Sequence, residues 1–240
     1  MAEQRGRSVG VARIGTEREV EMRRVRNGWF MAVALMAALL VATTAVAEPR
    51  PAHETLKEAA DAIQEELAAN EEHYAGDEEA LHDLVDRKLV PLVDFEVASR
   101  WVLGRHARDA SDDQLSEFQD EFQQMLMRFY SSALLEFDAW DLRFEEMRRD
   151  EGRPLGTVRA EAVPEDGSPV PVTFRVILRD GEWRVFDVSV EGISAVTNYR
   201  SNFGPIIRRD GLDALITRMG EWSADDDPVL QAAEKEREED

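Results

Sequence analysis

Two hydrophobic periods divide the chain. Between residues 53 and 134, apolar positions recur three and four residues apart, which is the period of one face of an α-helix. From residue 139 to residue 190, apolar and polar positions alternate, as they do along a half-buried β-strand. After Gly192 the helical period returns in two segments. This order of helices, strands and helices predicts an α+β fold with one antiparallel sheet.

The first helical part divides into three segments. Residues 53–69 have the pattern of an amphipathic helix. A second region covers residues 77–103, and we expect Pro91 to divide it because proline lacks the amide hydrogen that a helix interior needs. Ser111 is a suitable N-cap for a long third helix. The apolar stripe of this third helix consists of Leu115, Phe118, Phe122, Met125, Leu126, Phe129 and Tyr130.

Four strands are predicted in the alternating part. They cover residues 140–144, 158–162, 172–178 and 186–190. The Asp-Gly pair at residues 180–181 is typical of a tight hairpin turn between the last two strands. The connections are short enough for consecutive strands to pair. We therefore expect a four-stranded antiparallel curved sheet packed against several helices.

The stretch DVSVEGISAVTNYRSNF, residues 187–203, leads from the last strand through a glycine turn into a helix. Ile193, Val196, Tyr199 and Phe203 fall on one stripe of that helix. Such a stripe either fills the hydrophobic core or lines a cavity that an apolar molecule enters. The period alone does not separate these two interpretations.

The chain begins with the pattern of a secretory signal peptide. A basic stretch at residues 23–26 precedes an apolar run at residues 29–41 and a box of small residues at 45–47. The apolar run is shorter than the roughly 20 residues that a membrane-spanning helix requires. We therefore expect export, with cleavage near Ala47.

The charge of the chain is strongly negative. The formal net charge is −21, and residues 1–47 hold seven Arg and four Glu, so the remainder carries 22 basic and 46 acidic residues and a net charge of −24. Such a field repels nucleic acid, which we exclude as a partner. The acid-rich C-terminal end lacks an apolar period, which is typical of a solvated, mostly disordered tail.

The expected organisation is a signal peptide over residues 1–47, one folded domain over 48–222 and an acidic disordered tail over 223–240. The sequence leaves open whether translation starts at Met1 or at Met22.

Signatures of catalysis, metal binding and nucleotide binding are missing from the sequence. Cysteine is absent, and the four histidines lack the spacing of metal ligands. The Gly-x-Ser at residues 192–194 lacks the second glycine of a nucleophile elbow, and no glycine-rich phosphate loop occurs. We expect no catalytic residue, no metal site and no cofactor. Because carboxylates are abundant, a hydrolase that uses two of them stays open.

Two stretches carry a resemblance to a known family. They are VDFEVASRWVLGRHARDASDDQLSEFQDEFQQMLMRFYSSAL (93–134) and GEWRVFDVSVEGISAVTNYRSNFGPIIRRDGLDALI (181–216). Both resemble the periplasmic phospholipid-binding carriers of the maintenance-of-lipid-asymmetry (Mla) pathway, the MlaC or toluene-tolerance family. The shared patterns, in order and spacing, are DF…RxVLGR and DVxVEGIS…NYRSxF.

The resemblance implies a function and partners. Such carriers hold a phospholipid as cargo, with its acyl tails in an apolar cavity between a curved sheet and helices. They shuttle it through the periplasm between an inner-membrane ABC transporter complex, which has a lipid-binding substrate domain, and an outer-membrane lipoprotein–porin complex. No enzyme activity is implied.

The resemblance also indicates which residues would line the cavity. On this basis Arg200 either pairs with an acidic residue or lies near the lipid phosphate. The expected lipid-binding residues are Phe122, Met125, Leu126, Phe129, Tyr130, Phe174, Val176, Val188, Val190, Ile193, Val196, Tyr199 and Phe203.

Two alternatives remain at the level of sequence. A small periplasmic α+β enzyme, such as an isomerase or hydrolase, could use the same pocket and would need a titratable pair deep inside it. A periplasmic chaperone would instead present an exposed apolar groove.

Overall fold

The structure is a computed structural model that describes residues 49–131, 135, 140–164, 167–223 and 226–227. The predicted signal peptide and its cleavage site lie outside these residues. So does most of the predicted acidic tail.

One antiparallel sheet forms the centre of the fold. The four predicted strands are confirmed and pair in the order β1-β3-β4-β5. The prediction missed two strands of two residues each, because so short a strand shows no period: β2 pairs with β3, and β6 pairs with β5. The strands are β1 Trp140–Phe144, β2 Arg148–Arg149, β3 Leu155–Pro164, β4 Val170–Arg179, β5 Glu182–Val190 and β6 Ile193–Ser194.

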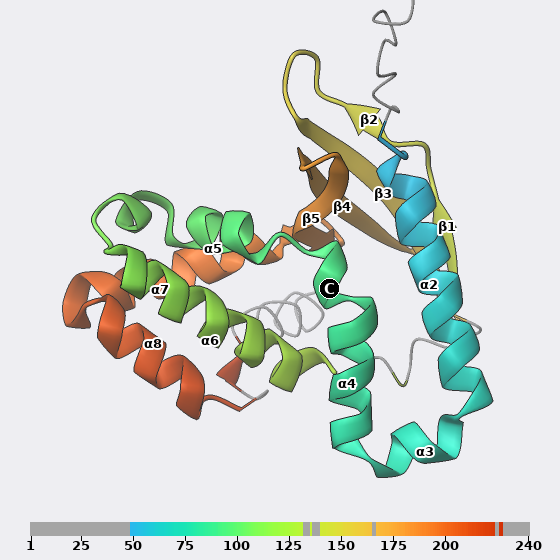
Figure 1. Ribbon diagram of the computed structural model, residues 1–240, viewed down its shortest axis with the longest axis horizontal. Coiled ribbons are helices and arrows are strands. Elements are labelled where there is room, and N and C mark those ends of the chain that lie inside the picture. The colour runs from blue at the N-terminus through green and yellow to red at the C-terminus, as the bar shows by residue number, and fades with distance from the viewer. Residues whose placement is uncertain (1–48, 132–134, 136–139, 165–166, 224–225, 228–240) are drawn as a thin grey trace, which may run out of the picture. The chain divides into compact units, whose positions relative to one another are not determined.

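Helices cover the sheet and extend beyond it. The helices are α2 Ala52–Ala69, α3 Glu71–Gly76, α4 Glu78–Lys88, η1 Val90–Leu92, α5 Phe95–Leu103, η2 Gly104–Arg108, α6 Asp112–Tyr130, α7 Ala195–Asp210 and α8 Leu212–Glu221. In Figure 1, α2 runs along the sheet beside β1 and β3, and α3 and α4 turn back from the end of α2. α6, α7 and α8 lie together, apart from α2.

Local sequence features account for where the main helices and strands begin and end. Ser111 accepts a hydrogen bond from the Gln114 backbone N–H at 3.1 Å, and the Gln114 side chain accepts one from the Ser111 N–H, so a capping box begins α6. The β4–β5 hairpin turns at Asp180 and Gly181, whose φ angles of 53° and 83° are both left-handed, as a two-residue hairpin turn requires. Pro91 interrupts the second helical region, and the chain forms only a short 3-10 helix there.

The apolar side chains form three separate clusters. One joins α5, α6, α7 and α8 around Phe118 and Phe203, and a second joins α2 to the sheet around Val158 and Val176. The third lies between α2, α3 and α4 around Leu84. A closely packed domain of this size usually has one contiguous core. The division into three indicates a space between the clusters.

A buried carboxylate fastens the start of α5 to the sheet. The Asp94 backbone N–H donates to the Val185 carbonyl at 2.8 Å, and the Asp94 side chain accepts from the Val97 N–H at 2.9 Å as the N-cap of α5. Asp94 is 4% exposed, and the Arg179 Nη1 lies 3.0 Å from both of its carboxylate oxygens. This network holds η1 and α5 against β5.

Replacement of Asp94 tests this network. We expect Asp94→Ala to lower the free energy of unfolding by about 2–3 kcal/mol, because it removes a helix cap and leaves Arg179 without its buried partner. Urea unfolding followed by circular dichroism measures the change. The control is Glu96→Ala, which removes the exposed ion pairs of Glu96 with Arg179 and Arg100 and should cost less than about 1 kcal/mol. Equal effects of the two variants would contradict this role of Asp94.

Candidate functional site

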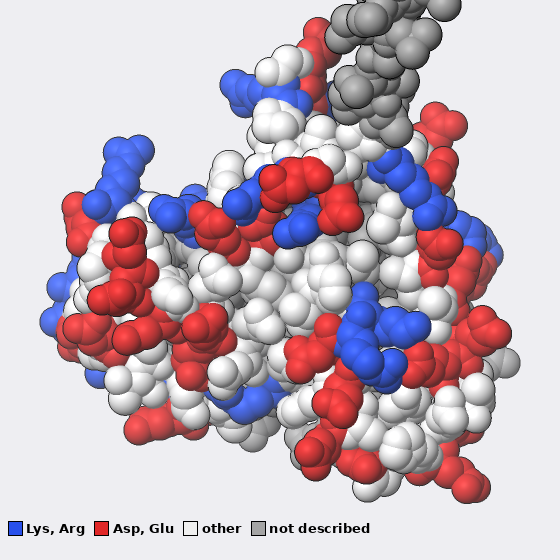
Figure 2. All heavy atoms as spheres, in the orientation of Figure 1, with Lys and Arg blue, Asp and Glu red and all other residues white. Residues whose placement is uncertain are grey.

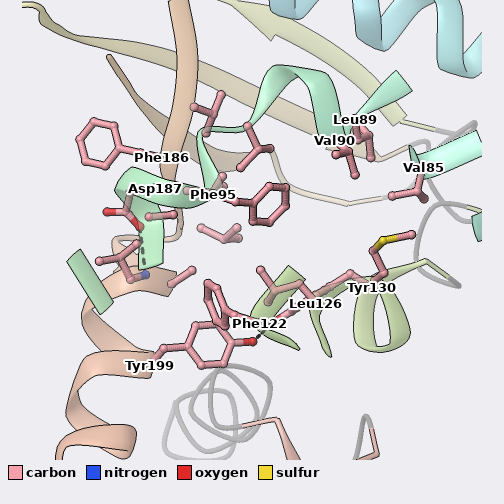
Figure 3. Close-up of a pocket in the computed structure, with 18 of the residues that line it drawn as sticks. Val85, Leu89, Val90, Phe95, Phe122, Leu126, Tyr130, Phe186, Asp187 and Tyr199 are labelled. Carbon is pink, nitrogen blue, oxygen red and sulfur yellow. Dashed lines mark hydrogen bonds between the residues drawn. The ribbon is translucent and has the colours of Figure 1, made fainter. Parts of the chain in front are cut away.

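A pocket of about 460 Å³ lies where the three clusters meet. Its walls come from α4, η1 and α5 on one side, from α6 and the start of α7 on another, and from β5 and β6 on the sheet side. Figure 3 shows Leu89 and Val90 across the pocket from Phe122 and Tyr199, with Phe186 at one end. The volume lies within the roughly 300–1,000 Å³ range of small-molecule sites.

The wall inside the pocket is apolar because the polar atoms of its buried residues are occupied within the protein. Asp187 is buried; its side chain accepts from the Ser194 hydroxyl at 2.8 Å and from the Val196 N–H at 3.1 Å, the bond drawn in Figure 3. The Ser131 hydroxyl donates to the Met127 carbonyl. The pocket therefore presents hydrocarbon rather than a set of free hydrogen-bonding groups to a ligand.

Two tyrosines and one carboxylate form a buried polar cluster in the wall. The Tyr199 hydroxyl donates to Asp227, with distances of 3.0 and 3.1 Å to the two carboxylate oxygens, and lies 3.4 Å from the Tyr130 hydroxyl. Asp227 is fully buried, whereas the sequence predicted a solvated tail from residue 223 onward. Of that segment the structure describes only residues 223, 226 and 227. Tertiary hydrogen bonds of this kind leave no signal in a hydropathy pattern.

Eight of the thirteen expected lipid-binding residues line the pocket. Three come from α6 and the others from β5, β6 and α7, as the aromatic stripe and the 187–203 stretch indicate. They are Phe122, Leu126, Tyr130, Val188, Val190, Ile193, Val196 and Tyr199.

Met125 and Phe129 belong to the core between α6 and α8 instead of the pocket lining. Successive helix residues are about 100° apart, so Leu126 and Tyr130 lie about 40° and about 80° to one side of Phe122. Met125 and Phe129 lie to its other side, by about 60° and about 20°. One stripe thus has two edges, and the sequence does not indicate which edge faces the pocket.

The other three residues outside the lining are covered by neighbouring helices. Phe203 lies one turn beyond Tyr199 on α7 and contacts Phe118 and Trp222, with ring centroids 6.2 and 5.8 Å apart. Phe174 and Val176 lie in the cluster that joins α2 to the sheet. They are on the face of the sheet that also forms the pocket wall, but α2 packs over their part of it.

The sequence reasoning missed one wall of the pocket. The missed residues belong to α4, η1 and α5, where Pro91 interrupts the helical period. The apolar run LVPLV at residues 89–93 was the available signal. The residues of this wall are Val85, Leu89, Val90, Val93, Phe95 and Ala98.

Among the described residues, Arg200 forms no ion pair with an acidic residue. Its guanidinium donates to the Trp101 carbonyl, with Nε at 2.6 Å, and lies 5.8 Å from the centre of the Trp101 ring. The open carbonyl at the end of α5 attracts a cation. Arg200 therefore ties α7 to α5, and it does not line the pocket.

Within the described part of the chain, no group of three or more histidine or acidic residues could hold a metal ion. None of the helices described combines the length and the apolar content that a bilayer crossing needs.

The fold and the pocket define an α+β protein built around an apolar ligand site. The profile of the family described as MlaC protein matches residues 57–221, which is more than half of the chain. The chain therefore belongs to the MlaC family. The predicted α+β class, with an open antiparallel sheet packed against helices, is likewise confirmed.

Known relatives agree with this assignment. The chain is 29% identical over 201 residues to the toluene tolerance protein ttg2D of Pseudomonas putida, covering 83% of this chain and 91% of that protein. It is 28% identical over 195 residues to the intermembrane phospholipid transport system binding protein MlaC of Haemophilus influenzae, covering 80% and 91%.

A solved structure shares the fold. It is the phospholipid-binding protein from Ralstonia solanacearum in complex with a phospholipid. The two structures superpose with a TM-score of 0.65 at 25% sequence identity, over 77% of this chain and 99% of that chain.

The tyrosines make the stability of the folded protein depend on pH. Burial raises the pKa of Tyr199 and Tyr130, and the nearby Asp227 carboxylate raises both further. Burial and the hydrogen bond to Glu66 raise the pKa of Tyr74, the third tyrosine of the chain. Above about pH 10, the ordinary tyrosine pKa, the folded protein therefore binds more protons than the unfolded chain, and its stability falls as the pH rises.

We expect the free energy of unfolding in urea to decrease from about pH 10 upward, with tyrosinate absorbance appearing only together with unfolding. Ultraviolet absorbance and circular dichroism on one sample measure both changes. Tyrosinate formation near pH 10 in a chain that keeps its native circular dichroism would contradict the burial of these hydroxyls.

Proposed function

We propose that this protein binds one phospholipid with its acyl chains in the pocket and carries it through the periplasm between an inner-membrane ABC transporter complex and an outer-membrane lipoprotein–porin complex. The observation that carries the proposal is the apolar pocket, whose inner polar atoms are occupied by the protein itself, the exposed Glu191 carboxylate excepted. The related Ralstonia protein was solved in complex with a phospholipid, and the Haemophilus relative is named for intermembrane phospholipid transport. The proposal assigns no catalytic step to this chain.

The hydrophobic effect explains why such a protein is needed. Exposing two acyl chains of about 16 carbons to water costs on the order of 20 kcal/mol, at about 0.8 kcal/mol per methylene. An apolar pocket removes most of this cost during passage through an aqueous compartment. The acyl chains are also shielded from water in a membrane, so the free energy of their transfer from membrane to pocket is close to zero. Affinity for lipid therefore cannot set the direction of transport.

The partners would therefore set the direction. On the face shown in Figure 2, acidic side chains are spread over α6 and α8 and around α3 and α4. A surface of this charge favours fast, salt-sensitive association with basic surfaces on the two membrane complexes. We infer that the chain docks on each complex in turn by such contacts.

Bound lipid is the direct test. We expect native mass spectrometry of the exported protein to show one added mass in the phospholipid range, and a solvent extract to identify it. Protein that carries no lipid, and takes none from vesicles after delipidation, would refute the proposal.

Variants on α6 separate the pocket from the core. Leu126→Asp places a charge in the lining, so we expect lipid retention to fall at least tenfold while the fold is kept. Phe129→Asp places the same charge in the core and should lower the free energy of unfolding by about 4 kcal/mol. Lipid extraction and urea unfolding measure the two effects. Gln124→Asp, on the exposed side of α6, is the matched control and should change neither. Normal lipid retention by a folded Leu126→Asp variant would show that the acyl chains bind outside this pocket.

A further inference from the structure

The most exposed part of the pocket lining lies at the turn between β5 and β6, and we take this turn as the mouth of the pocket. All residues of the lining are described, and Val190 and Glu191 are the two among them whose side chains are exposed. Val190 is 45% exposed although it is a large apolar residue. The remaining lining residues are buried or half-buried. A lipid whose chains fill the pocket would therefore place its head group beside this turn.

The backbone holds Glu191 at this place. Val190 pairs with Ile193, and the chain turns between them through Glu191 and Gly192, whose φ angles of 51° and 87° are both left-handed. The Glu191 N–H donates to the Pro171 carbonyl at 2.9 Å, which fixes the turn to the first residues of β4. A left-handed conformation is uncommon for a residue other than glycine, so the surrounding pairing determines the position of Glu191.

Glu191 also determines the charge of the mouth. No Lys, Arg or His lines the pocket. The other acidic lining residue, Asp187, is buried; it accepts from Ser194 and Val196, and its charge is compensated by Arg175 at 3.7 Å. Among the residues that the structure describes, none forms a hydrogen bond or ion pair with the Glu191 side chain. Its carboxylate therefore remains available to a ligand at the mouth.

We propose that Glu191 makes the mouth selective for phospholipids whose head group carries an ammonium group, such as a zwitterionic ethanolamine lipid, over lipids with a net negative head group. This inference rests on the proposed lipid-binding function and assigns the head-group class to the same site. A carboxylate attracts the ammonium and repels an uncompensated phosphate. The site is exposed, so the effect is modest, about threefold in relative occupancy.

The test separates head-group choice from lipid binding. Delipidated protein is incubated with vesicles that contain equal amounts of phosphatidylethanolamine and phosphatidylglycerol with identical acyl chains. The protein is then re-isolated, and mass spectrometry measures both the total lipid per chain and the ratio of the two head groups. Total lipid reports the proposed function, and the ratio reports the role of Glu191.

We expect the unaltered chain to be enriched about threefold in phosphatidylethanolamine at low ionic strength, and less so when salt screens the exposed carboxylate. Glu191→Gln should remove most of the enrichment, and Glu191→Lys should favour phosphatidylglycerol. Total lipid should stay the same in both variants. The matched control is Glu151→Lys, the same charge change at an exposed glutamate in the β2–β3 turn, which should keep the original ratio.

Two results would overturn the inference. If total uptake is normal but the bound lipids have the same head-group ratio as the vesicles, the selectivity is refuted and the lipid-binding function stands. An equal change of the ratio in Glu151→Lys and Glu191→Lys would assign the preference to the net charge of the chain instead of to the mouth. Absence of uptake by every variant would refute the lipid-binding function itself.

Discussion

The apolar face of the sheet extends further than the helix that covers it, and the pocket follows from this mismatch. α2 packs over the part of the face around Val158 and Val176, which are both fully buried. Val185 and Val188 belong to the same apolar cluster but also line the pocket. Apolar surface left in contact with water costs about 25 cal/mol per Å². A hydrocarbon ligand removes this cost, so the pocket favours an apolar occupant.

Two buried carboxylates fix two helices of the pocket to the sheet. Asp94 caps α5 and is joined through its backbone to β5, and Asp187 on β5 accepts from the Val196 N–H in the first turn of α7. The N-termini of both helices are therefore held at the same strand, each beside a negative charge that the helix dipole favours. α5 and α7 share one apolar cluster, and these bonds fix that cluster relative to the strand that forms the sheet side of the pocket.

The occupied polar atoms have a functional consequence. A ligand inside the pocket meets hydrocarbon on nearly all sides, so its binding depends on apolar surface and not on hydrogen bonds that would have to be broken again. A carrier benefits from this arrangement because release into a second apolar environment then needs little energy. Under the proposed function, recognition of polar groups is left to the mouth, and recognition of partners to the charged surface.

The sequence by itself determined the elements of this protein. The change of hydrophobic period located the longer helices and the four main strands, but not the short α3 and η2. The Ser111 cap and the Asp180–Gly181 turn marked boundaries that the structure confirms. These features are local, since each depends on residues that are neighbours along the chain. The motif of residues 187–203 also indicated a pocket wall, because it joins the strand and the helix that form two sides of the site.

Only the tertiary structure decided which apolar residues face the pocket and which fill the core. Met125 and Leu126 are adjacent on α6, yet one packs toward α8 and the other lines the site. The same holds for Phe174 and Val188, which are paired across β4 and β5, because α2 covers the first and the pocket exposes part of the second. Burial by a helix and burial by a ligand favour the same hydrophobic side chains. Hydropathy therefore cannot separate them, and only the placement of neighbouring elements does.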